Sequence, residues 1–342
     1  MSRRHLTSLL AVLALCTPAG AGEIGHFVGG LANIRDYVVP SEPGFYGVVY
    51  DFFYHTDQVN DRHGDDVSDF SFRLNRLPRR PRVNLHLDVD VSLYAVAPAF
   101  MWVSNWKFLG AKYAAYIAPS FSNTSLGAAL TTATGRGVNA DTSTFGVGDL
   151  YVQPIWLGWG LDHFDFAFGM GFYAPVGKYD TEKVAFPRIG RAVEVESTDN
   201  IGLGFWTQQT QLAASWYPWV HKATAVAFAL THEINTNKRD FDLVPGQVLT
   251  LNWGVSQYLP LSKDNTFLLE IGPAGYDTWQ VTSDSGADAQ SGTRDEVHGA
   301  GLQTGLTHVA WGAVLNFHYF YEYAAQDRFQ GQAFGLSLAK AF

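Results

Sequence analysis

Residues 82–93 read R-V-N-L-H-L-D-V-D-V-S-L, and this stretch decides what kind of fold the chain adopts. Apolar side chains at the odd positions from Val83 to Leu93 alternate with polar ones at the even positions from Arg82 to Ser92. A period of two is typical of a β-strand with one apolar and one polar face. The run exceeds the about 5–6 residues usual in soluble sheets and matches the ~9–11 residues of a tilted transmembrane strand. It therefore predicts a strand whose apolar face contacts lipid and whose polar face points inward.

The composition of the whole chain agrees with a membrane-embedded β protein. Of 342 residues, 15% are aromatic and only 16% are charged, and 34 are glycine, whereas a soluble domain has about 25% charged residues. Mean hydropathy is nevertheless near zero, as expected when half of every strand is polar. The formal net charge of −9 argues against nucleic acid as a partner, because phosphate contacts need basic surface.

The N-terminus has the pattern of a secretory signal peptide. Arg3 and Arg4 precede the apolar run 6–16, and Ala19-Gly20-Ala21 offers a cleavage site, so residues 1–21 are predicted to be removed. A lipoprotein signal centred on Cys16, the only cysteine, is the alternative. Glycines and prolines interrupt residues 22–43, which we expect to form an irregular segment, either periplasmic or plugging the barrel.

The remaining residues, 44–342, contain about twelve alternating runs. The connections between them are long and short in turn, with long polar stretches at 56–81, 119–145 and 175–200. Outer-membrane barrels have an even number of strands, long outer loops and short periplasmic turns. The sequence therefore predicts an all-β fold, a transmembrane antiparallel up-and-down β-barrel of bacterial outer-membrane type. A secreted soluble sandwich or lipocalin-like barrel also alternates and is the competing fold.

Features near the short turns and at the C-terminus favour the membrane fold. Six tryptophans lie close to these turns, as in the aromatic girdle of a membrane interface, and they are Trp102, Trp106, Trp156, Trp159, Trp216 and Trp219. The chain ends on Phe342 in an alternating strand, a C-terminal signal resembling those that outer-membrane assembly machinery recognises. Membrane lipid, lipopolysaccharide and this machinery are the partners we expect.

Several short motifs, in order, resemble those of the outer-membrane family labelled phenol meta-pathway degradation proteins, or transporters. They are Gly148-Asp149-Leu150, Pro154, Leu157-Gly158-Trp159, Pro175 to Asp180, Asn200, Gly202, Trp206, Glu233, Asn235-Thr236-Asn237, Gly275-Tyr276, Gln280, Thr282 and Asp284-Ser285-Gly286. The resemblance covers nearly all of the mature chain. It implies an outer-membrane barrel that takes up aromatic or other hydrophobic compounds. It implies no particular catalytic or binding residue.

Titratable residues on the predicted inward parity are the candidate site. They could line a permeation path and set its selectivity, or they could neutralise one another inside a narrow barrel. They are Asp51, His86, Asp88, Asp90, Lys112, His163, Asp165, Glu233, Glu270, His318 and Glu322. The basic run between Arg73 and Arg82 has no assigned role.

Motifs for covalent chemistry and for metals are weak. The acidic residues 57–66 miss the spacing of a calcium loop, so a solvated loop is the preferred interpretation. No zinc motif, nucleophile elbow or dinucleotide pattern fits, and we expect no catalytic residue, metal or cofactor. The favoured function is passive uptake of a small hydrophobic solute. A sealed structural or adhesion barrel and an outer-membrane acyl hydrolase using Ser215 and His232 are the rivals.

Overall fold

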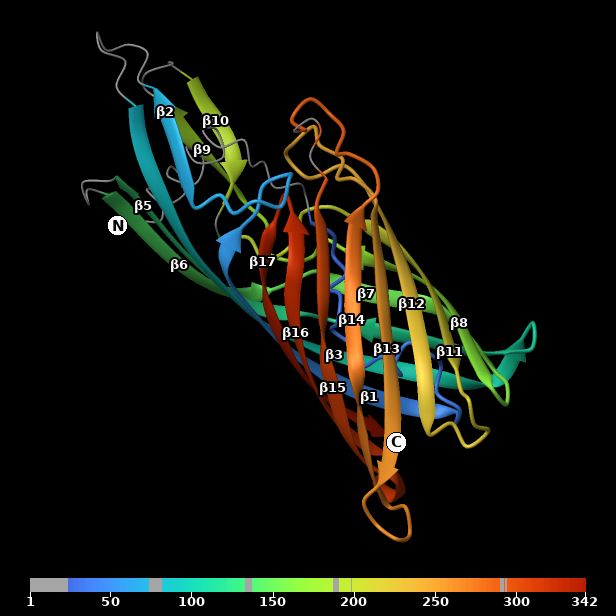
Figure 1. Ribbon diagram of the computed structural model, residues 1–342. Helices are drawn as coiled ribbons and strands as arrows, with labels where there is room; N and C mark the ends of the chain where they lie inside the picture. Colours follow the sequence, from blue (N-terminus) through green and yellow to red (C-terminus); the bar gives the residue numbers. More distant parts are fainter. Residues whose placement is uncertain are drawn as a thin grey trace.

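The computed structural model describes residues 24–73, 82–132, 137–186, 191–197, 199–289, 292 and 294–342, so the predicted signal peptide lies outside the described part. These residues form a closed antiparallel β-barrel of twelve strands (Figure 1). In the described part, no helix is long and apolar enough to cross a membrane. The barrel confirms the predicted all-β fold and strand number.

Residues 44–196 supply ten strands. They are β1 (Gly44–Val59), β2 (Asp69–Arg73), β3 (Arg82–Phe108), β4 (Ala111–Ala118), β5 (Phe121–Thr132), β6 (Gly137–Val147), β7 (Leu150–Gly160), β8 (Phe164–Ala174), β9 (Thr181–Phe186) and β10 (Arg191–Glu196). Residues 207–341 supply seven strands and a short 3-10 helix. They are β11 (Thr207–Trp216), β12 (Thr224–Asn235), β13 (Val248–Pro260), β14 (Phe267–Gln280), β15 (Glu296–His308), η1 (Val309–Trp311), β16 (Ala313–Gln326) and β17 (Phe329–Ala341).

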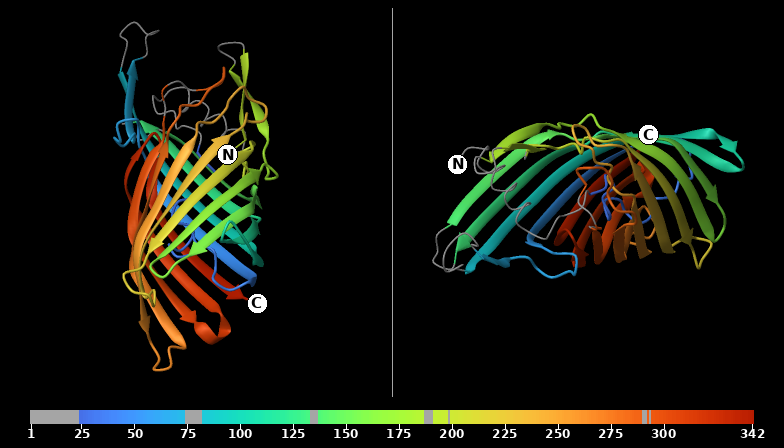
Figure 2. Two further views of the ribbon diagram at one scale, coloured as in Figure 1. Left: turned by 90° about the vertical axis from the view of Figure 1, so that its right-hand side faces the viewer. Right: turned by 90° about the horizontal axis from the view of Figure 1, so that it is seen from above.

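The barrel wall has twelve strand positions, and at two of them the position is shared by two shorter strands that follow one another along the barrel axis. β4 pairs with the end of β3 and β5 with its first half, while β6 and β7 continue one another in the next position. β1 closes the barrel by pairing with both β3 and β17. The hairpin of β9 and β10 forms a separate small sheet, and it rises at the same end of the barrel as β2 (Figures 1 and 2).

The predicted loop at 119–145 is wrong, because most of it forms β5 and β6. These strands are rich in Ser, Thr, Gly and Ala and lack a continuous apolar face. The N-terminal part of β3 pairs with β5. It begins before Val91, which is the first residue of β3 that pairs with β1. A strand that leaves the bilayer needs no apolar outer face, so alternation could not reveal it.

The two ends of the barrel differ in their connections. Short turns such as 109–110, 161–163 and 261–266 lie at the end where β1 begins and where the chain terminates, which is the periplasmic end. In the turn 261–266, hydrogen bonds from the side chain of Ser262 and from the hydroxyl and backbone of Thr266 lower the carboxyl pKa of Asp264 to about 2. The long connections 175–206, 236–247 and 281–295 lie at the extracellular end.

The outer surface carries a broad belt of exposed apolar side chains. It includes Phe166, Met170, Leu212, Phe228, Val255, Ile271, Leu302, Phe317, Leu336 and Leu338. A soluble protein rarely exposes so large an apolar surface, whereas a membrane barrel presents it to lipid. Trp106, Trp216 and Trp219 are exposed near the periplasmic turns, as predicted for a girdle. Trp156 is 5% exposed and lines the lumen, so its assignment to the girdle is wrong.

The orientation predicted for residues 82–93 is also wrong. Val91 and Leu93 line the lumen, and Ala95, Ala97 and Ala99 continue this inward face of β3. The even-numbered side chains point outward, as the exposed Tyr94 and Phe100 show. On β1 the inward side chains are likewise those of every second residue, namely Tyr46, Val48, Tyr50, Phe52 and Tyr54. The assumption that failed is that the lumen is polar on every side.

Candidate functional site

Residues 24–43 run through the lumen as a segment without helix or strand, here called the lumen segment (Figures 1 and 2). Its first residues lie beside Glu233 and Val248, at the extracellular ends of β12 and β13. Val39 packs against Gly158, near the periplasmic end of β7. The segment therefore passes along the barrel from the extracellular end to the periplasmic end, where β1 begins.

The extracellular end of the lumen segment is anchored through His26. Its imidazole Nε2 lies 2.9 Å from Asp149 Oδ2 and its Nδ1 lies 2.8 Å from Thr207 Oγ1. The ring stacks on Tyr173 with the centroids 4.6 Å apart. The buried carboxylate of Glu233 accepts the backbone N–H groups of His26 and Phe27. Four barrel side chains thus hold one turn of the segment in place.

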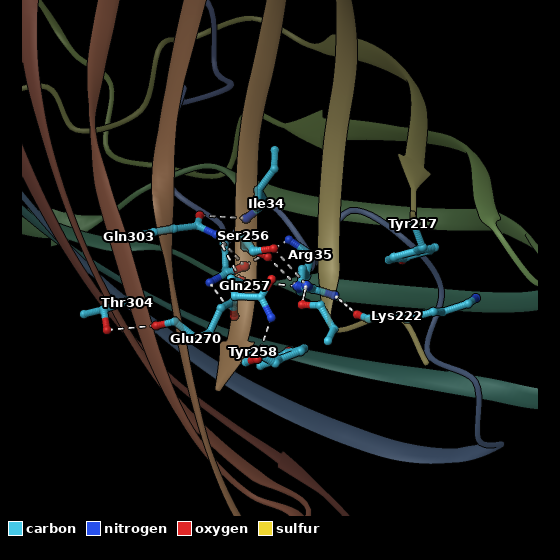
Figure 3. Close-up of polar contacts among 12 residues, drawn as sticks. Ile34, Arg35, Tyr217, Lys222, Ser256, Gln257, Tyr258, Glu270, Gln303 and Thr304 are labelled. Atoms are coloured by element: carbon cyan, nitrogen blue, oxygen red, sulfur yellow. Dashed lines mark hydrogen bonds and ion pairs between the residues drawn. The ribbon is translucent and has the colours of Figure 1, made fainter. Parts of the chain in front are cut away.

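The periplasmic end is anchored through Arg35 (Figure 3). Its Nε donates to Ser256 Oγ at 2.5 Å and lies 3.4 Å from Glu270 Oε1. Its Nη atoms donate to the carbonyl oxygens of Lys222 and Ala223 at 3.1 and 2.9 Å. The guanidinium carbon also lies 4.2 Å from the ring centroid of Tyr258. Arg35 supplies the positive charge that compensates a glutamate only 2% exposed.

Between these anchors, two glycines allow the segment to lie directly against aromatic rings. A Cβ at Gly29 would lie 2.6 Å from the ring of Tyr276, and one at Gly30 would lie 2.7 Å from the ring of Phe320. Gly30 also has a φ of +73°, which favours glycine. Its N–H donates to Asn252 Oδ1 at 2.8 Å, so the backbone of the segment is held as closely as its ends.

The first part of the lumen segment, residues 24–36, is hydrogen-bonded to one side of the barrel. Its hydrogen bonds from residues 24–36 reach groups in or next to β7 and β11–β15, and among the described residues none reaches β1, β3, β4 or β5. The opposite side, here called the apolar wall, consists of inward residues from two strands. They are Tyr46, Val48, Tyr50, Phe52 and Tyr54 of β1 and Val91, Leu93, Ala95, Ala97, Ala99 and Met101 of β3.

A cavity of about 1470 Å³ lies between the lumen segment and the apolar wall. Its lining reaches Phe329 and Arg328 at the extracellular end and Lys112 and Lys340 at the periplasmic end. It is therefore a passage-shaped space along the barrel, larger than the about 300–1,000 Å³ of an ordinary ligand pocket. One side is closed by the polar groups that anchor the lumen segment, and the other is lined by small apolar and aromatic side chains.

Six of the predicted inward residues do face the lumen. Lys112 and Asp165 line the cavity near the periplasmic end, and Asp165 pairs with Lys222 at 2.6 Å. Glu322 accepts the hydroxyl hydrogens of Tyr54 and Tyr276. The other three, Glu233, Glu270 and His318, are at most 2% exposed. The carboxylates Glu233 and Glu270 hold the lumen segment, and the His318 ring packs against Gly335.

Five predicted residues do not face the lumen, so their assignment as lumen-lining is wrong. Asp51 is on the outer surface, where it accepts a hydrogen bond from Tyr94 at 2.7 Å. His86, Asp88 and Asp90 lie on the outward face of β3, and His86 lies 3.1 Å from Asp69. His163 is exposed in a periplasmic turn and contacts the carbonyl oxygen of Tyr217. The reversed parity of β1 and β3 accounts for four of these errors.

This placement makes a direct prediction for Asp88 and Asp90. Replacing both with asparagine should leave the ion selectivity of the reconstituted barrel unchanged, because their carboxylates face outward, where a Debye length of about 8 Å screens them from the lumen. The reversal potential under a salt gradient measures this selectivity. Asp165→Asn is the matched lumen-facing substitution. A shifted reversal potential in the Asp88 and Asp90 variant alone would contradict the orientation of β3.

The residues that organise the lumen were not singled out by sequence reasoning. His26 and Arg35 lie in a stretch rich in glycine, where no periodicity indicates a direction. Asn252 and Gln303 are buried polar residues on strands, at 3% and 2% exposure. Arg35, the one lysine or arginine in residues 24–43, was the available signal, since a buried acid such as Glu270 needs a partner.

The arrangement of Ser215 and His232 contradicts the hydrolase hypothesis. Ser215 is opposite Ala227 in the ladder of β11 and β12, and His232 is opposite Thr210. Ser215 is 2% exposed and faces inward, whereas His232 contacts Gln247 with its Nε2 and lies on the opposite face of its strand. A nucleophile and its base must come within hydrogen-bonding distance, so this pair cannot serve.

The closed wall, the exposed apolar belt and the internal cavity define a β-barrel of the bacterial outer membrane. Comparison with solved structures agrees on the fold. An outer membrane channel from Pseudomonas putida F1 is 16% identical, with a TM-score of 0.61 over 91% of this chain and 100% of that one. The model of the family described as "Putative MetA-pathway of phenol degradation" matches residues 56–338, and the chain belongs to this family.

Other similarities are more distant. The β-domain of the Bordetella autotransporter BrkA is 11% identical with a TM-score of 0.44, covering 87% of this chain and 100% of that one. A FadL homologue of Pseudomonas aeruginosa is 9% identical with a TM-score of 0.36, covering 88% and 91%. No curated protein matches the sequence.

Proposed function

We propose that the protein is a passive outer-membrane channel for small hydrophobic solutes, aromatic compounds among them. The observation that carries this proposal is the cavity of about 1470 Å³ between the lumen segment and the apolar wall. Burial of apolar surface is favourable in proportion to its area, so this wall offers a solute such as an alkylbenzene an environment that a water-filled pore does not. The family description and the P. putida channel support the same function.

The proposal includes no covalent chemistry and no coupling to energy. The one hydrolytic pair considered, Ser215 and His232, lies on opposite faces of the sheet. Membrane lipid covers the apolar belt, and the lysines and arginines of the long loops contact lipopolysaccharide phosphate by charge pairing. Phe342, which is 80% exposed and donates its N–H to Phe45, is the element that assembly machinery recognises.

The test uses bacteria that carry the full-length protein in an intact outer membrane. N-phenyl-1-naphthylamine is an apolar aromatic dye whose entry the lipopolysaccharide leaflet slows, and its fluorescence rises as it reaches the inner lipid. Cells with the channel should take up the dye faster than cells without it, while leakage of a small sugar stays the same. Equal dye uptake in both kinds of cell would contradict the channel function and favour a structural role for a sealed barrel.

A further inference from the structure

Among the polar groups that face the cavity without a hydrogen-bond partner in the described part of the chain, four belong to Asp36, Tyr50, Tyr116 and Trp156. Oδ2 of Asp36 and Nε1 of Trp156 are buried and unpaired. The hydroxyl groups of Tyr50 and Tyr116 line the same cavity, and no hydrogen bond is found for either. Burying a polar group without a partner is costly, so each of these is a position where a ligand would replace missing contacts.

These groups lie together although they come from four elements. Tyr50 of β1 and Tyr116 of β4 pack against one group of buried residues. Trp156 of β7 lies in one cluster with Tyr37, the neighbour of Asp36 in the lumen segment. The rings of Tyr116 and Trp156, from β4 and β7, have centroids 6.2 Å apart. One acceptor, one N–H donor and two hydroxyls therefore surround one part of the passage.

The surroundings of the cluster are apolar. Tyr50 and Tyr116 pack against a group of buried residues that includes Val48, Ala99 and Ala118. Since Ala99 and Ala118 also line the cavity, a solute whose polar group reaches the cluster would rest its body on small apolar side chains. Such a site suits a molecule with one polar group and an otherwise hydrophobic surface.

We propose that Asp36, Tyr50, Tyr116 and Trp156 form a binding site for the hydroxyl group of a small, otherwise apolar solute, here called the hydroxyl site. A hydroxyl is the group that fits this set, because its hydrogen donates to the carboxylate while its oxygen accepts from a tyrosine hydroxyl or the indole N–H. A methyl ether cannot donate a hydrogen bond, and neither can a carboxylate ion. The inference rests on the proposed function and specifies the solute.

The experiment compares three probes of nearly equal size on the full-length mature protein in phosphatidylcholine nanodiscs. They are 4-methylphenol, its methyl ether and 4-methylcyclohexanol. Equilibrium dialysis measures the binding of each probe, and the amount taken up by empty nanodiscs is subtracted to remove partition into lipid. The protein should bind 4-methylphenol about tenfold more tightly than the ether, as expected for a site that loses a buried hydrogen bond. 4-Methylcyclohexanol tests whether an aliphatic hydroxyl is accepted as well as a phenolic one.

Variants connect the preference to the named residues. Tyr50→Phe and Tyr116→Phe remove one hydroxyl each and keep the ring, and Asp36→Leu removes the acceptor at similar volume. Each should bring the binding ratio of phenol to ether to within about twofold, because the hydroxyl loses its partner. Tyr321→Phe, on the exposed outer face, should retain the wild-type ratio. The tyrosine variants keep the test valid if Asp36→Leu does not fold.

The outcomes separate the two proposals. A wild-type ratio near one would mean that water alone satisfies the four groups and would overturn the hydroxyl site. A preference that persists in all three variants would place binding elsewhere and would also overturn it. If the preference follows these residues but cells take up no N-phenyl-1-naphthylamine through the barrel, the hydroxyl site stands and the channel function is overturned.

Discussion

The Arg35→Ala variant is expected to conduct ions several-fold better than the wild type and to unfold at a lower temperature. Removing the guanidinium leaves Glu270, which is 2% exposed, without its positive partner. Breaking a buried ion pair from one side costs about 3–5 kcal/mol. The hydrogen bonds to Ser256, Lys222 and Ala223 are lost at the same time. The periplasmic end of the lumen segment should therefore detach and leave a wider aqueous path.

Planar-bilayer conductance and thermal unfolding in detergent measure these two effects. Arg62→Ala, at an exposed position of the loop after β1, is the control and should change neither. The double variant Arg35→Ala/Glu270→Gln should regain part of the lost stability, because neither charge is then left alone. Wild-type conductance and melting temperature in Arg35→Ala would show that this residue does not hold the lumen segment.

The second large effect is expected on the apolar wall. Ala97→Trp, alone or together with Ala95→Trp, should lower the rate of N-phenyl-1-naphthylamine uptake about tenfold, equivalent to about 1.4 kcal/mol in the barrier. Both alanines line the cavity, and an indole at either position occupies the space opposite the lumen segment. The measurement is the initial rate of fluorescence increase in intact cells at matched expression.

Val96→Trp is the matched control for this prediction. Val96 lies between the two alanines on β3, and its side chain points to the other face of the strand. The same indole added there should contact lipid and leave dye uptake at the wild-type rate. Equal inhibition by the inward and outward substitutions would indicate a general folding defect, and no inhibition by the inward ones would mean that solutes do not follow this wall.

The architecture of the barrel could be predicted from the sequence because it depends on repeated local patterns. Alternation in strands such as β8 and β12, and the difference between short and long connections, are visible without any tertiary information. The aromatic face of Phe164 to Phe172 is indeed outward. Strand number and membrane class follow from such repeats.

The direction of β1 and β3 could not be predicted in the same way. The period of two shows that Val91 and Asp90 lie on opposite faces, but it does not say which face is inside. The usual expectation of a polar lumen fails here because the apolar wall lines the passage, and because Asp88 and Asp90 are on a part of β3 that extends past β1. A single strand carries no information about what faces it across the lumen.

The interior was the least predictable part, because its contacts join residues far apart in the chain. Lys112 and Asp165 face inward as parity indicates, but the roles of Glu233 and Glu270 depend on His26 and Arg35. These pairs are linked by a segment with no periodic structure of its own. Sequence reasoning placed these two glutamates correctly but did not identify the residues that bind them.

The anchoring of the lumen segment also constrains the order in which the protein folds. Its partners are 207 residues away for His26 and Glu233, 222 for Gly30 and Asn252, and 269 for Ile34 and Gln303. These hydrogen bonds require β12 to β15, which come late in the chain. Closing such long loops costs conformational entropy, and this cost precedes the stabilisation that the contacts provide. The lumen segment must therefore wait for the later strands, and a chain truncated after β11 would have a lumen segment with no Glu233, Asn252 or Gln303 to bind.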